Sequence, residues 1–223
     1  MILIIALLSI SHAPLRLSGK DAEQVLLHAI RHRYASLSSF AMHVDNQDTS
    51  GLFQGKYTQD LRWRKGGAFD LVARSREGKS KTELPDYYSR GRDVLEVLPN
   101  GDTRNSPSLP AAGTAAGWEV SSGYILSWLQ GTHYADDVFS DRVGQAVSWK
   151  FGPRATWHAM NCRELILYID GKPASSLTSI FVDARQKTLL GLETHITKKL
   201  GWALYSKQQF NSALPANVGK PPQ

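Results

Sequence analysis

The chain has 223 residues, of which 42% are hydrophobic and 21% charged, a composition typical of a globular protein with a sizeable core and not of a disordered or fibrous one. Its 26 Lys and Arg residues exceed its 20 Asp and Glu residues and give a formal net charge of +6. Because the basic residues are scattered, this charge permits weak attraction to anionic surfaces but does not predict nucleic-acid binding.

The N-terminus begins with an apolar run, Ile2 to Ile10, followed by Ser11-His12-Ala13. Crossing a bilayer takes about 20 apolar residues, so the run is too short for a membrane span and fits the core of a secretory signal peptide. No basic residue precedes the run, which leaves a buried N-terminal strand as the alternative. We expect residues 1–17 to be a signal peptide and leader, and the protein to be periplasmic or secreted.

Residues 18–37 are predicted to form an amphipathic helix. Ser18 is a candidate N-cap, with Asp21 three residues on, and apolar residues recur at helical spacing. The predicted apolar positions are Ala22, Val25, Leu26, Ala29, Ile30, Tyr34 and Leu37.

From Phe40 onward the apolar period changes to two, which is typical of strands. The clearest strand covers residues 53–64, and its length of about a dozen residues favours a strongly curved sheet. Glycine-containing turns then separate strands around residues 69–73, 86–88 and 94–98, which predicts a meander.

The second half begins with residues 101–122, whose Pro, Ala, Gly and Ser content is typical of a mobile loop. A short apolar helical stripe follows at Tyr124, Ile125, Trp128 and Leu129, and a second short helix is expected from Thr132. Strands resume at residues 147–151, 162–169, 177–182, 189–196 and 202–210. A helix, a meander, a helical insertion and a second meander predict a single α+β domain over residues 18–215, with a flexible tail at 216–223.

Two fragments imitate active-site motifs but lack a residue that the chemistry needs. His28 and His32 have the spacing of a helical zinc site, but Ala29 stands where a metalloprotease has its Glu. The run 73–80 ends like a phosphate loop, but Ala73 replaces its first Gly. We expect the two histidines to be exposed helix residues and the run to belong to a hairpin.

No motif names a reaction. His133, Asp136 and Asp137 would share one helical face and could ligate a metal, but no second cluster completes a site. The single cysteine, Cys162, lacks the companions of a zinc site and is expected in the core. We predict no metal, no cofactor and no catalytic residue, with a hydrolase built on a convergent Ser-His-Asp triad as an alternative.

Large apolar side chains recur at alternating strand positions and are expected to share one face of the curved sheet. They are Phe40, Met42, Phe53, Tyr57, Leu61, Trp63, Phe69, Leu71, Leu190, Leu192, Trp202 and Leu204. Either the helices fill this face as a closed core, or they leave an apolar cleft of the kind that holds acyl chains.

The element order and three segments resemble the LolA-like superfamily of periplasmic proteins. The segment Leu61 to Leu71 follows the long strand, Ser89 to Pro99 is similar to a family strand that ends in Pro, and Ile180 to Leu190 is similar to a family hairpin with an Asp at its turn. The resemblance covers about residues 20–215. It implies an open or half β-barrel, formed by one curved antiparallel sheet with an N-terminal helix and a short helical lid.

The resemblance also implies a soluble, non-enzymatic periplasmic carrier or sensor that binds lipid or lipoprotein acyl chains, as in lipoprotein transport and outer membrane biogenesis. The expected ligand-binding residues are Phe40, Met42, Tyr57, Leu61, Trp63, Phe69, Leu71 and Leu192 in the wall, with Trp128 and Leu129 in the lid. The expected partners are a lipid or an acylated protein, with an envelope protein and peripheral membrane contact as further possibilities, and no nucleic acid. The alternative is an envelope interaction or signalling module whose own side chains fill the core.

Overall fold

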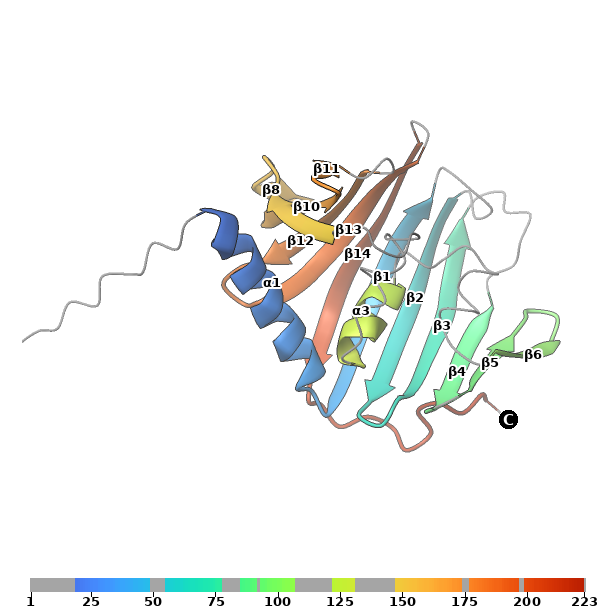
Figure 1. The fold of residues 1–223 in the computed structure, drawn as a ribbon. Helices are drawn as coiled ribbons and strands as arrows, with labels where there is room; N and C mark the ends of the chain where they lie inside the picture. Colours follow the sequence, from blue (N-terminus) through green and yellow to red (C-terminus); the bar gives the residue numbers. More distant parts are fainter. Residues whose placement is uncertain are drawn as a thin grey trace, which may run out of the picture.

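Most strands pair with their neighbours in the chain, and together they build one long curved antiparallel sheet (Figure 1). The computed structural model describes residues 19–48, 55–77, 85–91, 93–106, 122–130, 147–173, 177–196 and 199–222. Within these ranges the sheet has 12 strands in the order β11-β10-β12-β13-β14-β1-β2-β3-β4-β5-β6, with β7 paired to β10.

The strands fall into two meanders. The first contains β1 (Ser39–Asp48), β2 (Gly55–Arg64), β3 (Ala68–Glu77), β4 (Asp86–Arg90), β5 (Val94–Val97) and β6 (Thr103–Ser106). The second contains β7 (Val147–Phe151), β10 (Arg163–Ile169), β11 (Lys172–Pro173), β12 (Leu177–Asp183), β13 (Thr188–Ile196) and β14 (Lys199–Phe210). A separate small hairpin is formed by β8 (Thr156–Trp157) and β9 (Met160–Asn161). The last strand, β14, pairs with both β13 and β1 and joins the two meanders.

Alternation along the strands determines which face is buried. In β2, Tyr57, Leu61 and Trp63 are buried, while the residues next to each of them are half-buried or exposed. Trp63 stands opposite Phe40 on β1 and Phe69 on β3, and cross-strand partners share a face. The predicted alternation of the first meander is therefore confirmed, and its apolar face is the concave face of the sheet.

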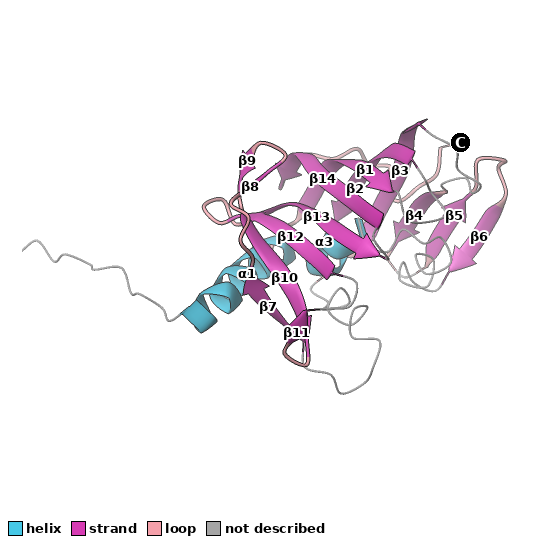
Figure 2. Ribbon diagram, turned by 90° about the horizontal axis from the view of Figure 1, so that it is seen from above, coloured by secondary structure: helices cyan, strands magenta, loops and turns pink. Residues whose placement is uncertain are grey.

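Among the residues that the structure describes, two helices cover that concave face. They are α1 (Gly19–Ala35) and α3 (Ser122–Leu129), and Figure 1 shows α3 in front of β1 and β2. Seen from above, the sheet is strongly curved but does not close, since β6 and β11 lie at opposite ends of it (Figure 2). The predicted fold class is confirmed: an α+β open half-barrel with an N-terminal helix and a short helix over its concave face.

The buried stripe of α1 differs from the predicted one. Leu27, Ile30 and Tyr34 are buried, whereas Val25 is 50% exposed. Residues in an α-helix are about 100° apart, so Val25, two positions before Leu27, points almost opposite to the stripe. Spacing alone was compatible with either stripe, and packing against the sheet and α3 selected this one. His28 and His32 are exposed, as expected.

Several predicted features lie outside the described residues. These are the signal peptide at 1–17, Phe53, the end of the run 73–80, the second short helix, and the metal candidates His133, Asp136 and Asp137. Neither helix in the described ranges is long and apolar enough to span a membrane.

The segment after β14 runs back along the sheet. Arg64 donates a hydrogen bond to the carbonyl of Pro215 at 2.9 Å. Val218 is buried, and Gly219, with φ of 81°, packs so closely that a Cβ there would overlap the carbonyl oxygen of Ser89. Gly219, in the segment that the sequence analysis assigned to a flexible tail, thus lies against β3 and β4.

Candidate functional site

The predicted wall and lid residues meet in one continuous apolar cluster on the concave face. Each of them is at most 8% exposed. They are Phe40 and Met42 from β1, Tyr57, Leu61 and Trp63 from β2, Phe69 and Leu71 from β3, Leu192 from β13, and Trp128 and Leu129 from α3. The sequence prediction that these residues come together is confirmed, while their role in binding a ligand stays a prediction.

Helix α3 contributes its own side chains to this cluster. Ile125, Leu126, Trp128 and Leu129 are all buried. The Trp128 ring lies 6.1 Å from the ring of Tyr34 on α1, measured between ring centroids. Because α3 occupies the face that a ligand would contact, an acyl chain that reaches the sheet must replace side chains of α3.

Helix α1 is fixed to the second meander through the hydroxyl group of Tyr34. This hydroxyl donates a hydrogen bond to Gln208 Oε1 at 2.7 Å and accepts one from the Leu189 N–H at 3.1 Å. Burial raises the pKa of Tyr34 far above its ordinary value, although the hydrogen bond from Leu189 acts in the opposite direction. The hydroxyl is therefore neutral at physiological pH and bridges β13 and β14.

Some residues predicted for the apolar face lie elsewhere. Leu192 and Ala203 are cross-strand partners and both belong to the core, so the alternating residues Trp202 and Leu204 project from the opposite, convex face. The β12–β13 register shifts beside Gly191, and this bulge leaves Leu190 half-buried. The prediction that Leu190 and Leu192 share one face assumed strict alternation along β13, and the bulge interrupts that alternation.

Polar side chains are also buried on the concave face. Asn46 is 2%, Gln59 0% and Thr194 7% exposed. Asn46 continues the inward series of Phe40, Met42 and Val44 on β1. The sequence analysis followed apolar residues only and missed these polar ones, although the same alternation places Asn46 inward.

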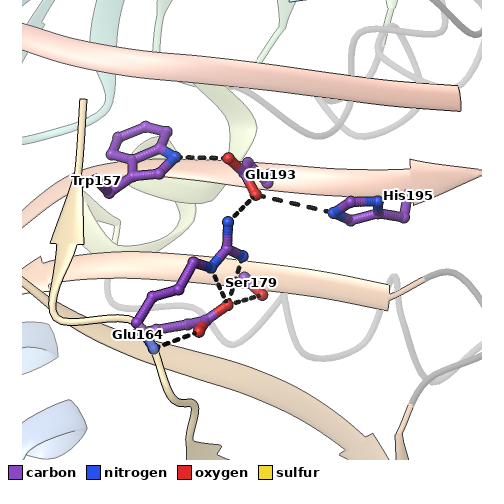
Figure 3. Close-up of polar contacts among 6 residues, drawn as sticks. Trp157, Glu164, Ser179, Glu193 and His195 are labelled. Atoms are coloured by element: carbon purple, nitrogen blue, oxygen red, sulfur yellow. Dashed lines mark hydrogen bonds and ion pairs between the residues drawn. The ribbon is translucent and has the colours of Figure 1, made fainter.

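A different kind of polar cluster lies on the convex face, where Arg154 joins two carboxylates. Figure 3 labels both of them, Glu164 and Glu193, with Ser179 and Trp157 beside them. The guanidinium group of Arg154 donates to Glu164 Oε1 from Nε at 2.8 Å and to Glu193 Oε2 at 2.5 Å. The side chains of Glu164 and Glu193 are only 3% and 9% exposed. We call this set of residues, together with Ser179 and Trp157, the outer cluster.

The outer cluster attaches the β8–β9 hairpin to the sheet. Trp157 stacks on Phe181 with a centroid separation of 4.3 Å and donates from Nε1 to Glu193 Oε1 at 2.6 Å. Gly191 lies under the indole ring, since a Cβ at that position would lie 2.3 Å from it. The glycine is therefore required for close packing of the hairpin.

The hydrogen bonds of the outer cluster determine its charge state. Burial alone would raise the pKa of Glu164, but hydrogen bonds from Arg154 and Ser179 outweigh it and hold the pKa below the ordinary value of 4.5. The nearby Cys162 is half-buried, not in the core as expected, because it lies in the connection between β9 and β10. Burial and the Glu164 charge raise the pKa of its thiol, which disfavours the reactive thiolate.

The convex face thus carries paired charges, and these ion pairs hold elements of the fold together. Further along it, Arg62 binds Asp70 through two hydrogen bonds of 2.9 and 2.6 Å. Among the residues that the structure describes, no three His, Cys, Asp or Glu side chains are placed to hold a metal ion.

Comparison with known proteins gives likenesses in structure only. No family model and no curated protein sequence matches this chain. The MucA/MucB complex from Pseudomonas aeruginosa contains a chain that is 10% identical with a TM-score of 0.50, and the match covers 91% of this chain and 61% of that one. The lipoprotein LppX of Mycobacterium tuberculosis is 14% identical, with coverage of 88% and 99% and a TM-score of 0.44.

A LolA superfamily protein from Nitrosomonas europaea is 9% identical, with coverage of 89% of this chain and 97% of that protein and a TM-score of 0.39. At these identities the comparisons show the fold alone. That fold is LolA-like, as the sequence resemblance implied.

Proposed function

We propose that this protein is a non-enzymatic carrier or sensor of the bacterial envelope that binds the acyl chain of a lipid or acylated protein on its concave face. The observation that supports this function is the continuous apolar face from β13 across to β3, which in the described part of the chain is covered by α1 and α3 and not by a second sheet. The N-terminal apolar run supports export to the periplasm.

Binding in this proposal is an exchange between the ligand and α3. Burying one methylene group contributes about 0.8 kcal/mol, so an acyl chain gains free energy of the same kind that the side chains of Ile125, Leu126 and Leu129 supply. Helix α3 has eight residues, and a helix this short is marginal without tertiary contacts. Its displacement by a ligand therefore costs little beyond the contacts that the ligand replaces.

The proposal is tested with one substitution made on each face. Ala203→Leu adds bulk to the concave face at a residue that is 1% exposed, whereas Ala41→Leu makes the same change on the opposite face of β1. Overpacking a core costs typically 1–3 kcal/mol, so urea unfolding first establishes that both variants fold. We expect Ala203→Leu to lower lipid binding at least tenfold and Ala41→Leu to leave it unchanged.

The measurement is native mass spectrometry with organic extraction, on protein purified without detergent from a bacterial envelope fraction. Bound mass that extracts as lipid supports the proposal. Protein that stays free of ligand, even after incubation with phospholipid and an acylated peptide, contradicts it.

That second result would favour an envelope interaction or signalling module with a filled core. One observation already speaks for this alternative: the wall residues are at most 8% exposed beneath α3. In such a module, Ala203→Leu would change stability without changing any lipid binding.

A further inference from the structure

The concave face has two unlike ends. Aromatic rings occupy the end where Phe40, Trp63 and Phe69 are cross-strand neighbours. Asn46 and Thr194 lie toward the other end, because β1 and β13 are parallel to each other on either side of β14 and both residues come late in their strands. We call the part of the face around Asn46 and Thr194 the polar end.

Two buried oxygen atoms at the polar end lack hydrogen-bond partners in the described part of the chain. They are Asn46 Oδ1 and Thr194 Oγ1. The amide nitrogen of Asn46 reaches Gln59 Oε1 only at 3.5 Å. Leaving a buried polar group unpaired costs about 1–3 kcal/mol, so a core that merely filled itself would be more stable with apolar residues at these positions.

Small residues separate the two oxygen atoms. The strand between them, β14, places Ala203 opposite Asn46 and Gly201 opposite Thr194. Neither residue has a side chain larger than a methyl group, so β14 contributes little bulk between the two polar side chains. The large inward side chain of β14, Tyr205, lies opposite Val44 and not opposite Asn46 or Thr194.

The chemistry of these atoms defines the group that would satisfy them. A carboxamide oxygen only accepts hydrogen bonds, and a threonine hydroxyl accepts or donates. Burial raises the pKa of the neighbouring Tyr205 well above its ordinary value, so this phenol stays neutral. The environment thus suits an uncharged group that donates a hydrogen bond.

We propose that the polar end binds the uncharged, hydrogen-bond-donating group next to the acyl chain of the ligand, either a hydroxyl or an amide N–H. This inference rests on the proposed function and specifies its ligand as a neutral acylglycerol or N-acyl amide. The acyl chain then extends from Asn46 toward Trp63. Tyr57 pairs with Asn46, and Trp63, six residues further along β2, lies about 20 Å away at 3.3 Å per residue.

Three probes with the same acyl chain test the proposal: 1-monolauroylglycerol, which has hydroxyl donors, N-methyldodecanamide, which has an amide donor, and methyl laurate, which has none. Their affinities for the full chain are measured by native mass spectrometry. We expect at least one donor probe to bind at least tenfold more tightly than methyl laurate. Preference for the first probe identifies a hydroxyl as the source of the hydrogen bond, and preference for the second identifies an amide.

The variants Asn46→Leu and Thr194→Val remove the two oxygen atoms while keeping similar side-chain volume. We expect both to reduce the affinity for the preferred donor probe to that for methyl laurate, and to leave methyl laurate binding and resistance to urea no lower than in the wild type. Asn161→Leu and Thr156→Val make the same changes at exposed positions of the β8–β9 hairpin and serve as controls.

Equal affinity of all three probes for the wild type, or an equal loss of all three in Asn46→Leu and Thr194→Val, would overturn the inference and leave the proposed function standing. If no probe binds the wild type, the proposed function fails together with the inference. Because Thr194→Val is isosteric, it gives a folded variant even if Asn46→Leu does not fold.

Discussion

The convex and concave faces both bury polar side chains, but they treat them differently. In the outer cluster, Glu164 accepts hydrogen bonds from Arg154 and Ser179, and Glu193 accepts from Arg154 and Trp157. At the polar end of the concave face, Asn46 and Thr194 each retain a buried oxygen without a partner in the described residues. The two regions lie on opposite faces of β13, whose neighbouring residues Glu193 and Thr194 belong to one region each.

The difference indicates two roles for buried polar groups. Buried polar groups that have all their hydrogen-bond partners hold the surrounding elements in one arrangement, because breaking such a contact leaves a buried charge without a partner. Unsatisfied groups lower stability and lose that penalty when another molecule supplies the missing hydrogen bond. We therefore interpret the convex face as a structural support and the concave face as the surface adapted to a ligand.

Arg154→Met breaks the convex region and has the largest expected effect. It leaves two buried carboxylates without their cation, and breaking a buried ion pair typically costs 3–5 kcal/mol. Because the Arg154 side chain is itself 36% exposed, we expect about 3 kcal/mol, measured by urea unfolding at pH 7. Arg185→Met, at an exposed turn residue, is the control and should change the unfolding free energy by less than about 0.5 kcal/mol.

The destabilisation caused by Arg154→Met is expected to depend on pH. In the wild type, the pKa of Glu164 is lowered in the folded state, so its charge stabilises the fold at pH values above the ordinary pKa of 4.5. This contribution is lost as the pH falls through the folded-state pKa. Without Arg154, the carboxyl group of Glu164 is protonated more easily, so at low pH the variant no longer buries an unpaired negative charge there. The difference between wild type and Arg154→Met should therefore shrink between pH 7 and pH 4; a constant difference would show that the charge is not its cause.

The same substitution at two tryptophans compares the faces directly. Trp157→Phe removes a hydrogen bond of 2.6 Å to Glu193, whereas Trp63→Phe removes a buried Nε1–H that has no partner in the described residues. Both variants lose similar ring area, so the difference between them isolates the hydrogen bond. We expect Trp157→Phe to cost about 2 kcal/mol more than Trp63→Phe in urea unfolding; equal losses would contradict the contrast between the faces.

Tyr34→Phe tests whether the cost of losing a polar group depends on its hydrogen-bond partners or on the face where it lies. It has the smallest expected effect. The hydroxyl lies on the helix side of the sheet, yet it is hydrogen-bonded to both Gln208 and Leu189. We expect a loss of about 1 kcal/mol in the free energy of unfolding. Tyr168→Phe, at a half-buried tyrosine on β10, should cost less than about 0.5 kcal/mol. No loss in Tyr34→Phe would mean that the concave side tolerates polar changes regardless of pairing.

Local periodicity predicted much of the fold and of the apolar face. The alternation in β2 identified Tyr57, Leu61 and Trp63 as inward residues, since a period of two depends only on neighbouring positions. It failed for Trp202 and Leu204, because the face of β14 depends on its register with β13, where Ala203 and not Trp202 stands opposite the inward Leu192. The stripe of α1 failed at Val25 for a similar reason: several stripes fit one sequence until a packing partner selects one.

The outer cluster could not be predicted in the same way. Arg154, Glu164 and Glu193 come from a loop and two strands that are not adjacent in the chain, and no spacing rule links them. Asn46 was different, because the alternation of β1 continues to it and places it inward, whereas its residue type had suggested the start of a turn. Inward polar residues in an otherwise apolar series therefore merit the same weight as the apolar ones.

The position of β14 has a consequence for how the chain assembles. It lies between β13 and β1 in the middle of the sheet, yet it is synthesised after all the other strands that the structure describes. Until it emerges, β1 and β13 each present an unpaired strand edge, and such edges readily pair with other chains. A chain that ends before Lys199 would keep both edges open, so aggregation through these strands is prevented only after β14 has been translated.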